Sequence, residues 1–232
     1  MLTLAIETAT SHTSVAVADE GRELSAWREV TGQDLCRRLA GEVHGALSRS
    51  GRGFAEVQLL AVGLGPGSFT SLRVGLATAK GIALARDVPL VGVSSLQAMA
   101  WQLRSRLSGL VCPVLDAKRR ELYAAIYRAS AREVQVVEKE FAASPADLAA
   151  RLALLPEPVT VFGELDQLSP EDRAHLSGLA LPEPAWPDAS AIADLGRRRY
   201  AERGADEISP LRPIYVRVSY AEESHHLDLG LR

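Results

Sequence analysis

Hydrophobic and polar residues follow strand-like and helix-like periods in a regular order along the chain. Three short β-rich runs come first, over Leu2–Glu7, Thr13–Ala18 and Glu23–Glu29. An apolar residue then recurs at helical spacing, at Leu35, Leu39, Val43 and Leu47. The opening of the chain therefore predicts a three-stranded meander followed by an amphipathic helix.

The same order of elements occurs twice. After the first helix we predict a strand at Leu59–Gly63, a helix at Phe69–Ala85, a strand at Leu90–Val93 and a helix from Ser94 to Arg106. The second half begins with strands at Leu110–Asp116, Glu121–Tyr127 and Glu133–Glu138 and continues with a helix at Ala146–Leu154 and a strand at Val159–Gly163. This order predicts a duplicated α/β fold, with helices packed on mixed sheets and a reduced second copy.

The end of the chain is less regular. Residues 166–186 are rich in Pro, Glu and Asp, which predicts irregular structure. A last helix is predicted over Ala189–Glu202, with Ile192 on its apolar side and the run Arg197-Arg198-Arg199 as a solvated face. Prolines predict an extended tail over 210–217.

One stretch joins a tight turn to an unusual helix. In Gly65-Pro66-Gly67-Ser68, Pro66 suits the first corner of a type II turn and Gly67 the positive φ of the second corner. Ser68 can cap the helix that follows. A glycine turn at a helix start also suggests a phosphate loop.

That helix carries a column of small residues. Ser71, Gly75, Ala79 and Ala83 recur every four residues and so share one face. A glycine in a helix interior costs about 1 kcal/mol relative to alanine. We therefore expect close packing on this column, either by a helix of the same domain or by a partner's helix.

Composition narrows the class of protein. The chain has 232 residues, 47% hydrophobic, with a net charge of −3, so any contact with RNA must be local or made by a partner. Cys36 and Cys112 are isolated and form no Cys-x-x-Cys pair, which favours a reducing compartment. With no leader before Leu2 and no apolar run of about 18 residues, we expect a soluble, cytoplasmic protein without membrane contact.

Four segments resemble a known family. They are Leu4–Thr10, Gly65–Gly81, Asp116–Tyr123 and Pro213–Arg217. In sequence and order these segments are similar to those of the TsaB (YeaZ) family, and the resemblance covers nearly the whole chain. The departures are mild, such as Glu7 where the family usually has Asp.

The resemblance implies both a fold and a function. The fold would be two ribonuclease-H-like lobes of the superfamily of sugar kinases, heat-shock ATPases and actin (ASKHA), at 1–106 and 107–203, with an extended tail at 204–232. The function would be that of a non-catalytic scaffold for TsaD, which transfers threonylcarbamoyl to adenosine 37 of tRNA in a complex with the ATPase TsaE. The chain itself would hold no cofactor, with ATP or ADP and metal on the partner subunits. tRNA would be an indirect partner, and a homodimer is possible for the chain alone.

We expect the partner to bind the helix pair 34–50 and 69–85. The candidate interface residues are Leu39, Val43, Ser71, Leu72, Gly75, Thr78, Ala79, Ile82 and Ala83, and the structural turn is Gly65, Pro66, Gly67 and Ser68. Gly75→Glu is then predicted to keep the fold and abolish the complex. Unchanged affinity would instead mean that the column packs inside the lobe.

An ATP-dependent transferase or kinase active on its own is the alternative function. Glu7, Thr8, Thr10 and Ser11 offer an acid and hydroxyl groups for nucleotide or magnesium, but no glycine lets a phosphate approach the backbone. An acid that ends a first strand also commonly bonds local backbone. The second half has no Gly-Gly pair.

Other chemistry finds less support. Among five histidines none has a partner at i+4, so we predict no metal site, and no Gly-x-Ser-x-Gly elbow occurs. We therefore predict no catalytic residue and reject a peptidase. The run Lys118-Arg119-Arg120 is expected to be a solvated turn, with a contact to the tRNA backbone as the alternative.

Overall fold

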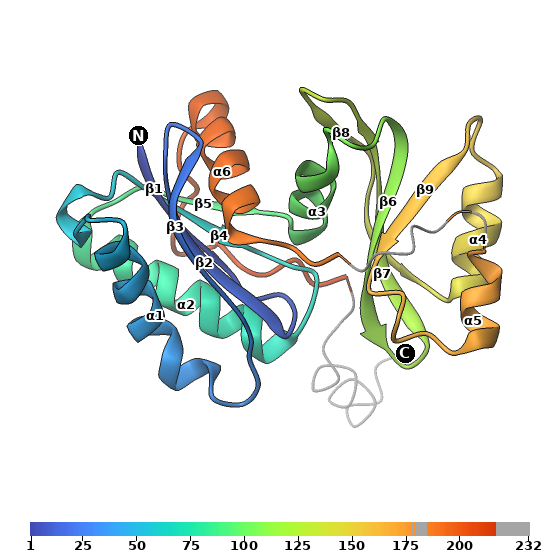
Figure 1. Ribbon diagram of the computed structural model, residues 1–232, viewed down its shortest axis with the longest axis horizontal. Helices are drawn as coiled ribbons and strands as arrows, with labels where there is room; N and C mark the ends of the chain where they lie inside the picture. The colour runs from blue at the N-terminus through green and yellow to red at the C-terminus, as the bar shows by residue number, and fades with distance from the viewer. Residues whose placement is uncertain (178, 180–184, 217–232) are drawn as a thin grey trace.

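The protein is described from a computed structural model that covers residues 1–177, 179 and 185–216 (Figure 1). Its elements form five layers, in which a central pair of helices separates two sheets and each sheet carries further helices on its outer face. This arrangement confirms the predicted α/β class with two lobes.

The first sheet has five strands. They are β1 (Leu2–Glu7), β2 (His12–Asp19), β3 (Arg22–Val30), β4 (Leu59–Gly63) and β5 (Leu90–Val93). Their order is β3-β2-β1-β4-β5, with β1 antiparallel to β2 and parallel to β4. All residues of β1, β4 and β5 are buried, as expected for strands covered on both faces.

The second sheet repeats this order with one strand fewer. Its strands are β6 (Gly109–Lys118), β7 (Glu121–Ala129), β8 (Val134–Ala143) and β9 (Val159–Gly163), in the order β8-β7-β6-β9. The first strand again pairs antiparallel with the second and parallel with the fourth. The duplication and the reduced second copy are therefore both present.

The helices divide between the outer faces and the centre. Outside the first sheet lie α1 (Leu35–Arg49) and α2 (Phe69–Arg86), and outside the second lie α4 (Pro145–Ala153) and α5 (Pro170–His175). A 3₁₀ turn, η1 (Phe54–Glu56), follows α1. The central pair is α3 (Ser95–Leu103) and α6 (Ala189–Arg203), which pack against each other and share one core with both sheets.

The central helices cross the expected lobe boundaries. Although α3 follows the first sheet in sequence, it packs on β6 and β7 of the second. Conversely, α6 follows the second sheet but packs on β4, β1 and β2 of the first. Thus α3, inside the predicted range 1–106, packs with the second lobe, and α6, inside the predicted range 107–203, packs with the first. The described tail does so too, because Ile208, Leu211 and Ile214 pack beside α2.

Two local predictions also need correction. The stretch 166–186 is not wholly irregular, because Ser169 caps the short helix α5 with Pro170 in its first turn. The three arginines 197–199 are not a uniformly solvated face, since Arg197 pairs with Asp194 and Arg199 with Asp206. Strand β8 runs to Ala143, beyond the predicted end at Glu138, and the other helices and strands lie close to their predicted ranges. Arg217 lies outside the described residues.

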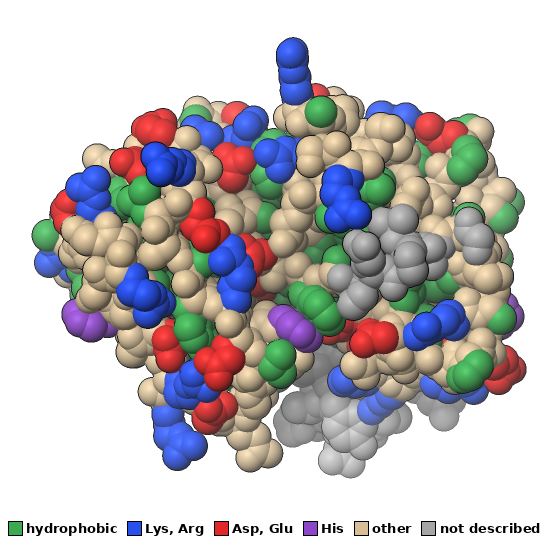
Figure 2. All heavy atoms as spheres, in the orientation of Figure 1, with side chains coloured by type: hydrophobic (Ala, Val, Ile, Leu, Met, Phe, Trp, Pro, Cys, Tyr) green, Lys and Arg blue, Asp and Glu red, His purple; other side chains and the backbone are tan. Residues whose placement is uncertain are grey.

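The surface mixes charges of both signs. On the face shown in Figure 2, acidic and basic side chains are interspersed over the first lobe. In the described part of the chain, no helix is both long enough and apolar enough to cross a bilayer.

Candidate functional site

The turn before α2 brings this helix against the end of β1. Gly65, not Gly67, takes the positive φ, of 88°, so the predicted type II turn is wrong. Gly67 is needed for another reason, because a Cβ there would lie 2.1 Å from the Ala9 carbonyl oxygen. Ser68 caps α2 as predicted, accepting from the Ser71 N–H.

The small column on α2 faces its own lobe. Gly75, Ala79 and Ala83 are buried, and a Cβ on Gly75 would lie 2.3 Å from the Thr8 hydroxyl oxygen. The Thr8 hydroxyl donates to the Ser71 carbonyl at 2.9 Å, which closes this contact. The column is therefore a packing seam between α2 and the sheet, and the predicted interface through it is corrected.

The other predicted interface residues fall into a buried group and a half-buried group. Leu39, Val43 and Leu72 are buried, the first two in the core between the sheet and its outer helices. Ser71, Thr78 and Ile82 are half-buried. Periodicity identified the helix pair but selected its inward side.

The outward side of the pair carries exposed arginines, such as Arg37 and Arg73, and also several small or apolar residues. On α2 it presents Ala77, Gly81 and Leu84, and on α1 it presents Ala40 and Gly41. A Cβ on Gly81 or Gly41 would meet nothing within 4 Å, and Leu84 is 69% exposed. We refer to these five residues as the outer helix face. The sequence does not identify the residues of the outer helix face, because it does not show which side of each helix packs on the sheet.

Glu7 is fully buried where β1 ends. Its Oε1 accepts from the Ala9 N–H at 2.6 Å and its Oε2 from the Ser95 hydroxyl at 2.7 Å. Ser95 in turn accepts from the Gly65 N–H. Burial raises the pKa of Glu7 to about 7, although these hydrogen bonds oppose the shift. Glu7 thus joins β1, the turn before α2 and α3.

The hydroxyl candidates beside Glu7 have mixed positions. Thr8 is buried against α2, whereas Thr10 and Ser11 line a cleft of about 740 Å³ between the lobes. Residues of the α2 start, Ser68 to Ser71, line the same cleft. Only part of the predicted nucleotide site therefore faces a space that could receive a ligand.

The second lobe contributes two carboxyl groups to this cleft, Asp116 and Glu164. Glu164 accepts from the Asp116 N–H at 2.9 Å, and burial raises its pKa. Lys118 pairs with Asp116 at 2.6 Å. Sequence reasoning missed Glu164, which follows β9 directly; the matching position after β4 is Leu64, so the repeat gave no signal.

The basic run at the end of β6 forms a strained hairpin turn. Lys118, Arg119 and Arg120 all have positive φ, at 62°, 55° and 60°. This conformation costs most L-residues about 1–2 kcal/mol each. All three residues are exposed, as predicted for a solvated turn, and Arg120 also pairs with Asp172 at 2.9 Å and Lys118 with Asp116. Among the described residues, no three His, Cys, Asp or Glu side chains gather as metal ligands would.

Comparisons with known proteins agree on one relationship. The family model described as "TsaD: tRNA N6-adenosine threonylcarbamoyltransferase" matches residues 29–187. The tRNA threonylcarbamoyladenosine biosynthesis protein TsaB of Escherichia coli (strain K12) is 31% identical over 227 residues, covering 95% of this chain and 96% of that relative. TsaB of Bacillus subtilis (strain 168) is 27% identical, covering 96% of each chain. The solved structure of YeaZ from Pseudomonas aeruginosa superposes with a TM-score of 0.77 at 26% identity, covering 92% of this chain and 100% of that one.

The repeated strand order and the cleft between the lobes define the class: a two-lobed ribonuclease-H-like protein of the sugar-kinase, heat-shock ATPase and actin superfamily, with a reduced second lobe. Within that class, the chain belongs to the TsaB (YeaZ) family.

Proposed function

We propose that this protein acts in the synthesis of tRNA threonylcarbamoyladenosine as a non-catalytic subunit that binds and stabilises TsaD. The observation that carries the proposal is full-length similarity to TsaB, a named biosynthesis protein of this modification. We place the contact on the outer helix face, since the inward column is occupied by the protein's own sheet.

The match to a TsaD family model supports this partner. Residues 29–187, which include α1 and α2, resemble the catalytic subunit itself. Two related folds can pair through equivalent surfaces, as two copies of one chain do across a two-fold axis. A helix pair of TsaD packed on the outer helix face would make such a pseudo-symmetric contact.

The chemistry of the outer helix face fits a helical partner. Small residues such as Ala77 and Gly81 let a second helix approach closely. Burying the exposed side chain of Leu84 would add about 1.5–3 kcal/mol. Without TsaD, the same face would pair with a second copy of this chain.

The non-catalytic part of the proposal is supported by Glu7. Both oxygens of its carboxyl group already accept hydrogen bonds, from Ala9 and Ser95, and no surface of the residue is exposed. We therefore assign ATP, metal and TsaE contacts to the complex rather than to this chain, and place the complex in the cytoplasm.

The alternative function is an ATP-dependent transferase that is active without a partner. One observation favours it: the carboxyl groups of Asp116 and Glu164 line the cleft between the lobes. Calorimetry of the isolated chain with Mg-ATP separates the two functions. The scaffold proposal expects neither tight binding nor turnover. Tight binding with hydrolysis would contradict it.

Reconstitution tests the proposed function itself. TsaD, TsaE and threonylcarbamoyl-adenylate are incubated with tRNA in the presence and absence of this chain, and modified adenosine is measured by mass spectrometry. We expect modification only when the chain is present. Equal modification without it would refute the role.

A further inference from the structure

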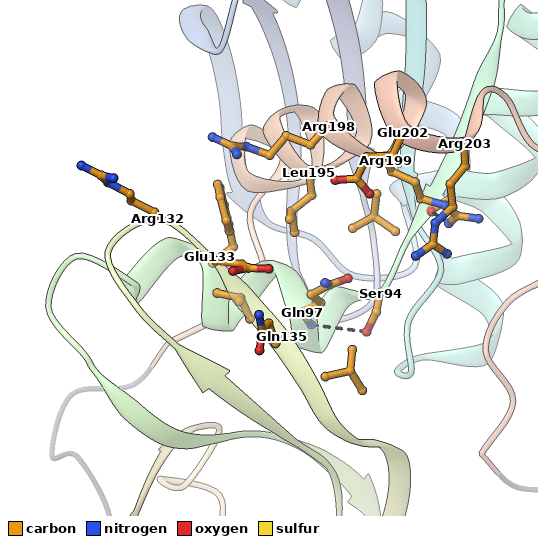
Figure 3. A pocket seen from close by; sticks show the side chains of 15 residues that line it. Ser94, Gln97, Arg132, Glu133, Gln135, Leu195, Arg198, Arg199, Glu202 and Arg203 are labelled. Carbon is orange, nitrogen blue, oxygen red and sulfur yellow. Dashed lines mark hydrogen bonds between the residues drawn. The ribbon is translucent and has the colours of Figure 1, made fainter.

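A second cleft, of about 610 Å³, lies where α6 meets the edge strand β8 (Figure 3). Its floor is formed by the start of α3, where Ser94 accepts from the Gln97 N–H. Its walls come from α6 on one side and from the β7–β8 turn with β8 on the other. It shares no lining residue with the cleft that contains Asp116 and Glu164.

Positive charge dominates this second cleft. Four arginines line it, Arg132, Arg198, Arg199 and Arg203, against the two carboxyl groups of Glu133 and Glu202. In Figure 3, Arg132 and Arg198 extend towards one end of the cleft, while Arg199 and Arg203 lie at the other. In a chain of net charge −3, this is a local field of the opposite sign.

Two of these arginines already contact other residues of the protein through their side chains. Arg199 donates to the Gly92 carbonyl and pairs with Asp206 at 2.6 Å. Arg198 lies over the Trp101 ring, 4.5 Å from its centroid, and within 3.5 Å of Asp194. They hold α6 against the first sheet and α3.

Arg132 and Arg203 are available to a ligand. Both are exposed, and neither has an ion-pair or hydrogen-bond partner for its side chain among the described residues. One is on the β7–β8 turn and the other on the last turn of α6. A guanidinium group offers two parallel N–H donors, the geometry that phosphate oxygens accept best.

The cleft suits a phosphate backbone better than a nucleobase. Trp101 is the aromatic residue in the lining, and its ring is covered by Arg198 and by Arg104, whose guanidinium lies 3.8 Å from the centroid. Trp101 is only 4% exposed. No open aromatic face is thus offered for the base stacking that binds unpaired bases.

We propose that the cleft between α6 and β8 binds the sugar–phosphate backbone of RNA, with Arg132 and Arg203 each contacting phosphate at opposite ends of it. The choice of RNA among phosphate ligands rests on the proposed function, whereas the phosphate chemistry rests on the cleft itself.

The test measures binding of a fluorescent tRNA transcript to the isolated chain by anisotropy between 50 and 200 mM salt. The variant Arg132→Glu/Arg203→Glu should bind at least about tenfold more weakly and reduce the salt slope by about 2, one for each lost phosphate contact. Arg22→Glu/Arg49→Glu is the matched control, because it removes two exposed arginines of the first lobe outside the cleft and should bind as wild type.

Three results would overturn the proposal: unchanged affinity in the cleft variant, an equal loss in the control, or tripolyphosphate bound at this cleft in place of tRNA. Co-purification of each variant with TsaD separates this proposal from the scaffold function. If the cleft variant still binds TsaD and its RNA affinity is unchanged, only the RNA site is refuted. If the cleft variant loses RNA affinity and the chain never binds TsaD, the RNA site is supported and the scaffold function is refuted.

Discussion

A fully buried carboxyl group, Glu7, ends β1 and accepts hydrogen bonds from two separate segments. Its type and place suggested a magnesium ligand, yet its oxygens are used within the fold. Sequence could place Glu7 at the end of a strand, but not Ser95 beside it, because that contact spans 88 residues. The other role expected for Glu7, a hydrogen bond with local backbone, is confirmed, because its carboxyl group accepts from the Ala9 N–H.

The raised pKa of Glu7 predicts a pH-dependent stability. The folded state holds the proton up to about pH 7 and the unfolded state only to about 4.5, so stability present below pH 4.5 is lost as the pH rises to 7. Glu7→Gln cannot ionise. Its free energy of unfolding should rise relative to wild type across this window by roughly 3 kcal/mol. Urea denaturation between pH 4.5 and pH 8 measures this difference, and parallel curves would contradict it.

Asp87 ends α2 in the left-handed conformation, with a φ of 53°. It is exposed, and its negative charge lies at the negative end of the helix dipole. Asp87→Gly should therefore raise the free energy of unfolding by about 1 kcal/mol and the melting temperature by about 2–4 °C. Asp87→Asn, which removes only the charge, should give a smaller gain. A glycine variant that melts below wild type would refute this account.

At the scale of the element, α2 shows what periodicity can and cannot predict. The four-residue spacing of Gly75, Ala79 and Ala83 identified a close-packed face correctly. It could not tell whether the neighbour was a partner or the protein's own sheet, because both demand small residues. The decisive contact is the hydroxyl of Thr8, a residue 67 positions earlier that sequence reasoning had assigned to a nucleotide site.

Two glycines of α2 should therefore respond in opposite ways to alanine. At Gly75 the new methyl group meets Thr8, so Gly75→Ala should lower the free energy of unfolding by about 1–3 kcal/mol. At Gly81 the space is open, so Gly81→Ala should raise it by about 1 kcal/mol through helix propensity. Chemical denaturation of the two variants provides the measurement. Equal effects would show that α2 is packed differently.

At the scale of the whole molecule, the two lobes are joined by the exchange of α3 and α6. The succession of strands and helices along the chain, the duplication and most element bounds were predictable, because each depends on local periodicity. The exchange was not, since the small residues of α6 fit either sheet: Gly196, for example, lies against Ala61 of β4 although it follows the second lobe in sequence. The arginine cleft beside α6 depends on this exchange and was therefore also beyond sequence reasoning.

The central claim is that TsaD binds the outer helix face. Binding of purified TsaD to Gly81→Glu, measured by calorimetry, tests it most directly. Ala150→Glu, at an exposed position of α4 in the other lobe, is the matched control. We predict that Gly81→Glu keeps the wild-type circular dichroism and loses at least about a hundredfold in affinity, while Ala150→Glu binds as wild type. Wild-type affinity in a folded Gly81→Glu would contradict the claim.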